Sequence, residues 1–130
     1  MSIHPTFRYD DPRAAIDFLT GALGFRELTC HTDDAGRVAH AELGWTDGVE
    51  DGPVTGVLAL GTRGDADPFD TGRAVTYLTC DDPDALHDRA VTAGATVAMG
   101  LTDQDYGSRE FAISDPEGNA WCLGTYRMGG

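Results

Sequence analysis

The chain has 130 residues, enough for one domain with a hydrophobic core. Its formal net charge is −13 at pH 7, so we expect no nucleic-acid partner and no binding to anionic lipid, because both need basic surfaces. No stretch approaches the roughly 18 apolar residues of a membrane span and no signal peptide is visible, so we expect no membrane partner and a cytoplasmic location.

The first half of the chain predicts one helix among four strands. Apolar and polar residues alternate over 3–9, which is typical of a half-buried strand. Asp11 and Pro12 then favour a helix that continues to residue 23 and ends at Gly24. Further strands are predicted over 25–32, 37–45 and 54–60, with a turn at 33–36. Alternation over 37–45 assigns Ala39, Ala41 and Leu43 to the helix side.

The second half repeats this order. Asp81-Asp82-Pro83 matches Asp10-Asp11-Pro12 after 71 residues, a spacing that indicates two copies of one structural unit. The copy predicts a strand over 74–80, a helix over 82–93, and strands over 95–101, 108–114 and 120–126. A five-residue turn is expected at 115–119.

The two copies define the predicted architecture. We expect a single α+β domain over 1–130, made of two paired β-α-β-β-β modules over 1–61 and 74–130, with a polar linker over 62–73. The helices should cover one face of the strands only, and the other face should curl around something or lie open to water. Any pocket should lie between the copies.

The repeat, together with the run Phe111-Ala112-Ile113-Ser114-Asp115-Pro116-Glu117-Gly118-Asn119-Ala120-Trp121, resembles the vicinal oxygen chelate superfamily. That superfamily includes glyoxalase I, extradiol dioxygenases and bleomycin-resistance proteins. The resemblance covers nearly the whole chain. It implies paired modules that form a cup-shaped mixed sheet with the helices on its outer face, in many members with four metal-ligand positions.

The ligand positions that the resemblance implies are mostly replaced. Counting from the two Asp-Pro steps and from the turn glycine gives His4, Ala59, Val75 and Cys122. His4 is the only usual ligand retained, and Cys122 stands where enzymes usually have Glu. Zinc and iron sites need several donors, so we expect no metal and no other cofactor. The alternative is a divalent metal at His4.

Alternation along the strands predicts which side chains face the cup. They are His4, Thr6, His40, Glu42, Tyr77, Glu110 and Cys122. His40 and Glu42 share one strand face, so they could act as an acid–base pair or form a structural hydrogen bond.

These observations favour binding over catalysis. We expect a small-molecule-binding protein, closest in character to the metal-free bleomycin-resistance-like branch. It would sequester an apolar or cationic compound such as an antibiotic, and the acidic surface favours a cation. The resemblance also implies a homodimer. The alternative is a metal-dependent lyase, isomerase or dioxygenase that uses His4 with His40, Glu42 or Glu110.

Overall fold

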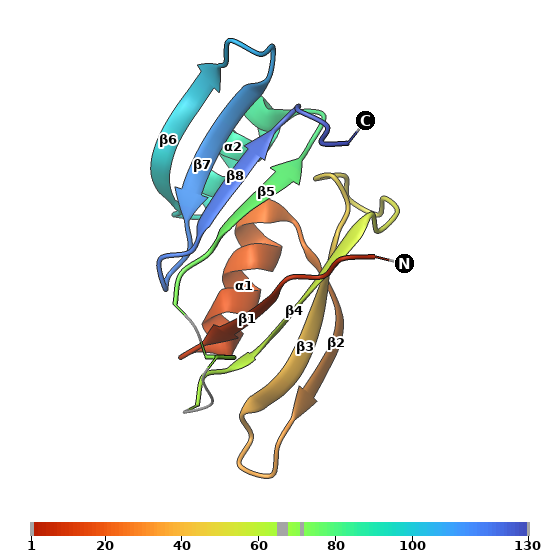
Figure 1. Ribbon diagram of the computed structural model, residues 1–130, viewed down its shortest axis with the longest axis vertical. Coiled ribbons are helices and arrows are strands. Elements are labelled where there is room, and N and C mark those ends of the chain that lie inside the picture. Colours follow the sequence, from red (N-terminus) through yellow and green to blue (C-terminus); the bar gives the residue numbers. More distant parts are fainter. Residues whose placement is uncertain (1, 65–67, 71, 130) are drawn as a thin grey trace.

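The computed structural model describes residues 2–64, 68–70 and 72–129 (Figure 1). Its elements follow in the order β1 (Thr6–Tyr9), α1 (Pro12–Leu23), β2 (Arg26–Thr32), β3 (Val38–Trp45), β4 (Gly56–Thr62), β5 (Val75–Thr79), α2 (Pro83–Thr92), β6 (Thr96–Asp103), β7 (Arg109–Ser114) and β8 (Ala120–Gly124). The expected linker, 62–73, includes residues 65–67 and 71, which lie outside the described residues.

The strands form two four-stranded mixed sheets of matching topology. The strand orders are β1-β4-β3-β2 and β5-β8-β7-β6, and in each sheet the first pair is parallel and the others are antiparallel. In Figure 1, α2 lies behind β7 and β8, and β1 crosses in front of α1. The predicted α+β class and the repeated module are therefore confirmed. Neither of the described helices is long and apolar enough to cross a membrane.

The repeated Asp-Pro steps begin both helices, as the sequence predicts. Asp11 accepts a hydrogen bond from the Ala14 backbone N–H, and Asp82 accepts one from that of Ala85, both at 3.1 Å. Each cap satisfies one of the free donors of the first helical turn. Gly24 ends α1 with φ of 79°, a conformation that a residue with a Cβ rarely adopts.

One detail of the predicted alternation in β3 is wrong. Ala41 and Leu43 are buried on the helix side as expected, but Ala39 is exposed and Val38 is buried instead. The pairing with β2 explains the change, because the register shifts between His31 and Thr32 and leaves Ala39 without a partner. Such a bulge reverses the faces that the following residues present.

Both modules contribute to one hydrophobic core. The ring of Trp121 on β8 packs 5.3 Å from that of Phe7 on β1 and 5.9 Å from that of Phe25, which follows α1. α1 also packs directly against α2. Because the core spans the two sheets, the modules hold each other in a defined orientation.

The expected turn at 115–119 forms several side-chain hydrogen bonds, some of which reach the first module. Asp115 is buried, and its Oδ2 accepts from the hydroxyl of Tyr9, the side chain of Asn119 and the indole N–H of Trp121. The Glu117 carboxylate accepts from the backbone N–H groups of Asp10 and Asp11. The turn of the second module is thereby bonded to the Asp-Asp-Pro step of the first.

Candidate functional site

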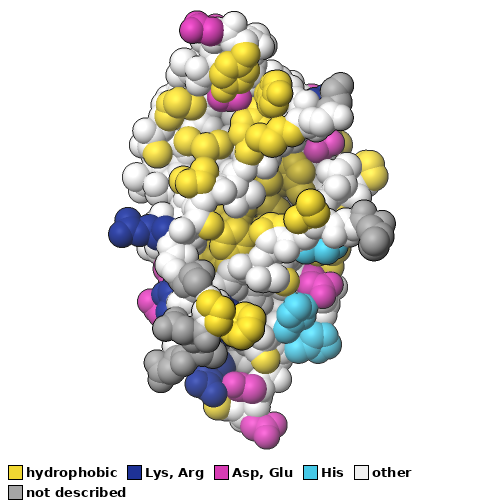
Figure 2. All heavy atoms as spheres, viewed as in Figure 1, with side chains coloured by type: hydrophobic (Ala, Val, Ile, Leu, Met, Phe, Trp, Pro, Cys, Tyr) yellow, Lys and Arg dark blue, Asp and Glu magenta, His cyan; other side chains and the backbone are white. Residues whose placement is uncertain are grey.

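An apolar groove of about 290 Å³ lies between the two modules. Figure 2 shows hydrophobic side chains gathered in a hollow between the two sheets. The groove is lined by Ile3, Pro5, Phe25, Trp45, Asp47, Thr55, Gly56, Val57, Leu58, Thr76, Tyr77, Leu78 and Thr79. Concave, mostly apolar sites with a few polar groups are the usual form of small-molecule sites.

The groove lies where the start of β4 in the first module faces β5 of the second. β1 and β5 are each the outermost strand of their sheet. Trp45 bridges the modules, since its indole N–H donates to the Thr79 carbonyl at 2.9 Å and its ring packs 5.0 Å from that of Phe25. Both aromatic walls are therefore held in place before any ligand binds, which lowers the entropy cost of binding.

The predicted residues of the first module lie together on its open sheet face. His4, His40 and Glu42 line a cavity of about 370 Å³, and Thr6 and His40 line a smaller one of about 120 Å³. The His40 ring nitrogen and the Glu42 carboxylate are 2.8 Å apart. Half of the His40 side chain is exposed. The pair is therefore in contact with solvent and contributes little to the stability of the fold.

The predicted residues of the second module form a separate group. Glu110 is only 5% exposed and accepts hydrogen bonds from Tyr77 at 2.8 Å and from Tyr106 at 2.6 Å. Burial would raise the pKa of Glu110, but the hydrogen bonds from Tyr106, Tyr77 and Ser108 outweigh it and hold that pKa below the usual glutamate value. The hydrogen bond between Tyr106 and Glu110 also raises the pKa of Tyr106, to about 12. Glu110 is thus an ionised carboxylate held by neutral donors.

The structure leaves these two groups apart within one chain. Over the described ranges, no hydrogen bond or ion pair joins His4, Thr6, His40 or Glu42 to Tyr77, Glu110 or Cys122. Tyr77 is the one predicted site residue among those that line the groove.

The sequence did not predict Phe25 and Trp45 as groove residues or Tyr106 as a hydrogen-bond partner of Glu110. Trp45 and Phe25 were missed because burial on the helix side and a place in the groove give the same sequence signal. Tyr106 was missed because it lies in an expected loop, where periodicity carries no information.

The residues at the implied metal positions do not fit a divalent metal. Only His4 and Cys122 carry a donor atom, whether the modules that meet belong to one chain or to two. Both ring nitrogens of His4 already bond, one to the Ser2 hydroxyl and one to the Val57 carbonyl. Burial and the charge of Glu110 raise the pKa of the Cys122 thiol, which keeps it protonated. In the described part of the chain, no three His, Cys, Asp or Glu side chains are placed to hold a metal ion.

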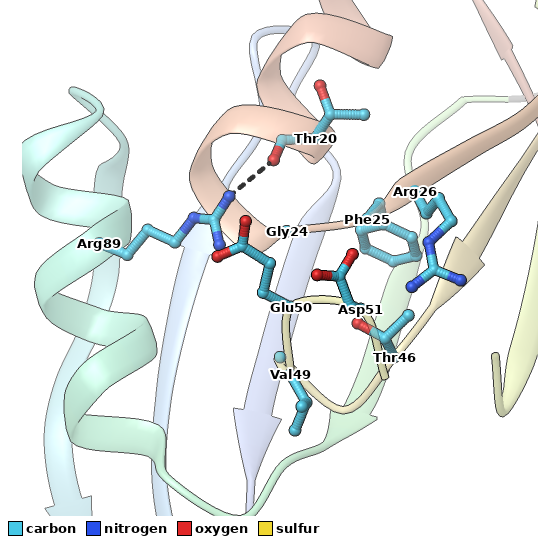
Figure 3. Close-up of a pocket in the computed structure, with 10 residues that line it drawn as sticks. Thr20, Gly24, Phe25, Arg26, Thr46, Val49, Glu50, Asp51 and Arg89 are labelled. Atoms are coloured by element: carbon cyan, nitrogen blue, oxygen red, sulfur yellow. Dashed lines mark hydrogen bonds between the residues drawn. The ribbon is translucent and has the colours of Figure 1, made fainter. Parts of the chain in front are cut away.

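A further cavity, of about 370 Å³, lies on the helix side (Figure 3). Its charged walls include Glu50 and Asp51 beside Arg26 and Arg89. Arg89 donates to the carbonyls of Thr20 and Gly21 in the last turn of α1 at 3.2 and 3.0 Å, and Arg26 donates to the Gly52 carbonyl at 2.9 Å. These guanidinium groups are engaged in hydrogen bonds to backbone carbonyls. The arginines that line this cavity therefore have a structural role, which is to hold α1, α2 and the 46–52 loop together.

Comparison with known proteins agrees with this geometry. A model of the Glyoxalase/Bleomycin resistance protein/Dioxygenase superfamily matches residues 2–123. An uncharacterized protein of Mycobacterium bovis is 35% identical over 134 residues, which cover 95% of this chain and 82% of the relative. An uncharacterized protein of Mycobacterium tuberculosis H37Rv is equally similar, with 95% of this chain and 73% of the relative covered.

Solved structures show the same fold. TioX from Micromonospora sp. ML1 has a TM-score of 0.76 at 24% identity, with 100% of this chain and 99% of TioX covered. TnmS3, an antibiotic binding protein from Streptomyces sp. CB03234, has a TM-score of 0.70 at 24% identity, with 95% and 94% covered. Together with the repeated modules and the sequence match, they place the chain: it belongs to the Glyoxalase/Bleomycin resistance protein/Dioxygenase superfamily.

Proposed function

We propose that this chain is a small-molecule-binding protein that sequesters an apolar or cationic compound in the groove between its modules, without a metal. The observation that carries the proposal is the groove itself, with Phe25, Trp45 and Leu58 as apolar walls and Tyr77 and Asp47 as polar groups. Burying an apolar ligand there gains about 25 cal/mol for each Å² removed from water.

The metal-free part of the proposal rests on donor chemistry. Two of the four positions that the family uses carry Ala59 and Val75, which have no donor, and His4 is already hydrogen-bonded. A binding protein needs no activated water or polarised carbonyl, so loss of these donors leaves sequestration intact. Antibiotics are the first compounds to test, because TnmS3 binds one and shares this fold.

A thermal-shift screen tests the proposal. Antibiotics and planar aromatic compounds are added singly to the metal-free protein, and any that raises the melting temperature is then titrated by calorimetry. A compound present at about 100 times its Kd should stabilise the folded chain by about 2.7 kcal/mol. If no apolar or cationic compound binds, the proposal is wrong.

Two matched variants then locate the site. Ile3 and Val97 are both exposed, at 96% and 40%, but only Ile3 lines the groove. Ile3→Asn should weaken binding because it puts a polar group on an apolar wall, whereas Val97→Asn should leave the Kd unchanged. Equal effects of the two substitutions would place the ligand outside the groove.

A further inference from the structure

The Glu110 carboxylate carries a charge that no described side chain neutralises. It is 5% exposed, and the side chains that donate hydrogen bonds to it, which include Tyr77, Tyr106 and Ser108, are neutral. The chain has no lysine, and no described arginine or histidine forms an ion pair with Glu110. Arg109, its neighbour in the chain, bonds instead to Asp84 at 2.6 Å and to Asp103 at 3.1 Å. Neutral hydrogen-bond donors keep this carboxylate ionised, so its negative charge is not cancelled by any described cation and remains able to attract a cationic ligand.

Two aromatic rings stand beside this charge. Tyr106 donates its hydroxyl to Glu110, and its ring packs edge-on against that of Tyr126, with 5.8 Å between the ring centres. The two residues are 61% and 46% exposed, so a ligand can reach their rings. Tyrosine faces attract cations, and a carboxylate close behind them adds to that attraction.

The surrounding backbone is shaped to accommodate the carboxylate. A Cβ at Gly124 would collide with Cγ of Glu110 and would lie 2.5 Å from the Tyr77 hydroxyl oxygen. The Tyr126 backbone N–H donates to both the Tyr77 hydroxyl and Ser108 Oγ at 3.1 Å. The position of Glu110 is therefore set by Tyr77 on β5 and Gly124 on β8, as in a preorganised binding site.

We propose that Glu110, Tyr106 and Tyr126 form a subsite for an organic ammonium group of the ligand. The inference rests on the proposed function and makes it more specific. Tyr77 connects the two parts, because it lines the groove and also donates to Glu110. The ligand that fits both parts has an apolar body in the groove and a protonated amine against the exposed rings of Tyr106 and Tyr126, with the Glu110 carboxylate behind them. The net charge of −13 also favours the approach of such a cation.

Phenylalkylamines of increasing chain length and the matching neutral phenylalkanols test this subsite. Their Kd values are measured by NMR titration at a pH where the amines are protonated. The wild-type protein should bind the best amine about tenfold more tightly than its alcohol. Glu110→Gln should remove this preference, so that the amine and its alcohol bind with similar Kd values. Glu42→Gln, which removes an exposed carboxylate from the other sheet, should keep the preference.

Tyr106→Leu provides a second test, since it alters an exposed side chain and keeps the carboxylate. It should also reduce the preference for the amine. If Glu110→Gln and Tyr106→Leu both bind the amine as the wild-type protein does, the subsite is wrong and the groove stands. If neither series binds to the wild-type protein, the subsite is wrong, and the thermal-shift screen with antibiotics and planar aromatic compounds decides the proposed function separately.

Discussion

The hydroxyl of Tyr9 on β1 donates a 2.7 Å hydrogen bond to Oδ2 of Asp115, which lies 106 residues further along the chain. Tyr9 is fully buried and Asp115 is 5% exposed, so the bond crosses the junction between the modules away from water. Hydrogen bonds to charged groups in such surroundings are stronger than those on the surface. The Asp-Pro-Glu-Gly-Asn turn, which carries the family resemblance, therefore serves to join the two modules.

Substitution of either partner should destabilise the fold. Tyr9→Phe removes one of several donors to Asp115 and should cost about 1–2 kcal/mol, whereas Asp115→Asn places an amide among groups that all donate and should cost about 3 kcal/mol. Urea unfolding measures both. Tyr126→Phe is the control, because Tyr126 is exposed, and it should change the unfolding free energy by less than about 0.5 kcal/mol.

Gly124→Ala should destabilise the chain by about 1–3 kcal/mol, because the new methyl group would collide with Glu110 and crowd Tyr77. In a Glu110→Ala background the same substitution should cost less, a coupling that a double-mutant cycle measures. Gly100→Ala on β6 is the matched control, since its methyl group would meet no atom within 4 Å. Equal costs of Gly124→Ala in both backgrounds would show that Glu110 does not occupy this space.

The pH dependence of stability should report the state of Glu110. Its pKa in the folded chain lies below the usual glutamate value, so its ionised form stabilises the folded state. That contribution is complete above the unfolded-state pKa of about 4.3 and is lost as the pH falls through the lower folded-state pKa. Urea midpoints should therefore fall more steeply with acidification in the wild-type chain than in Glu110→Gln. Parallel curves would contradict the prediction.

Metal content should be substoichiometric in protein purified without a chelator. Elemental analysis measures it, and His4→Ala should leave it unchanged, because His4 and Cys122 alone cannot form a tight site. One divalent ion per chain in the wild-type protein, lost in His4→Ala, would overturn the metal-free proposal and restore the enzyme alternative.

The chain should be a homodimer in solution. Val75 is 75% exposed on β5, the edge strand that faces the groove, and an exposed apolar residue at a strand edge favours association. Sedimentation equilibrium should give twice the 13.8 kDa of one chain. Val75→Asp should lower this mass, and Val91→Asp on α2, which is 47% exposed, should not. A mass of one chain at all concentrations would contradict the prediction.

Local sequence signals were sufficient for the elements of the fold. Asp11 and Asp82 cap the helices through backbone groups three residues away, so their effect can be recognised without knowing the rest of the structure. The first strand was predicted over 3–9 but starts at Thr6. Pro5, which has no N–H to donate to a sheet, stands just before that start.

The sequence by itself determined the repeat and the helix caps, because each depends on residue identity at short or regular spacing. Only the tertiary structure decided that Trp45 spans the modules, that Tyr106 covers Glu110, and that the predicted cup residues fall into two groups. These relationships depend on how two sheets pack around a shared core. Such long-range packing joins residues whose spacing along the chain follows no period.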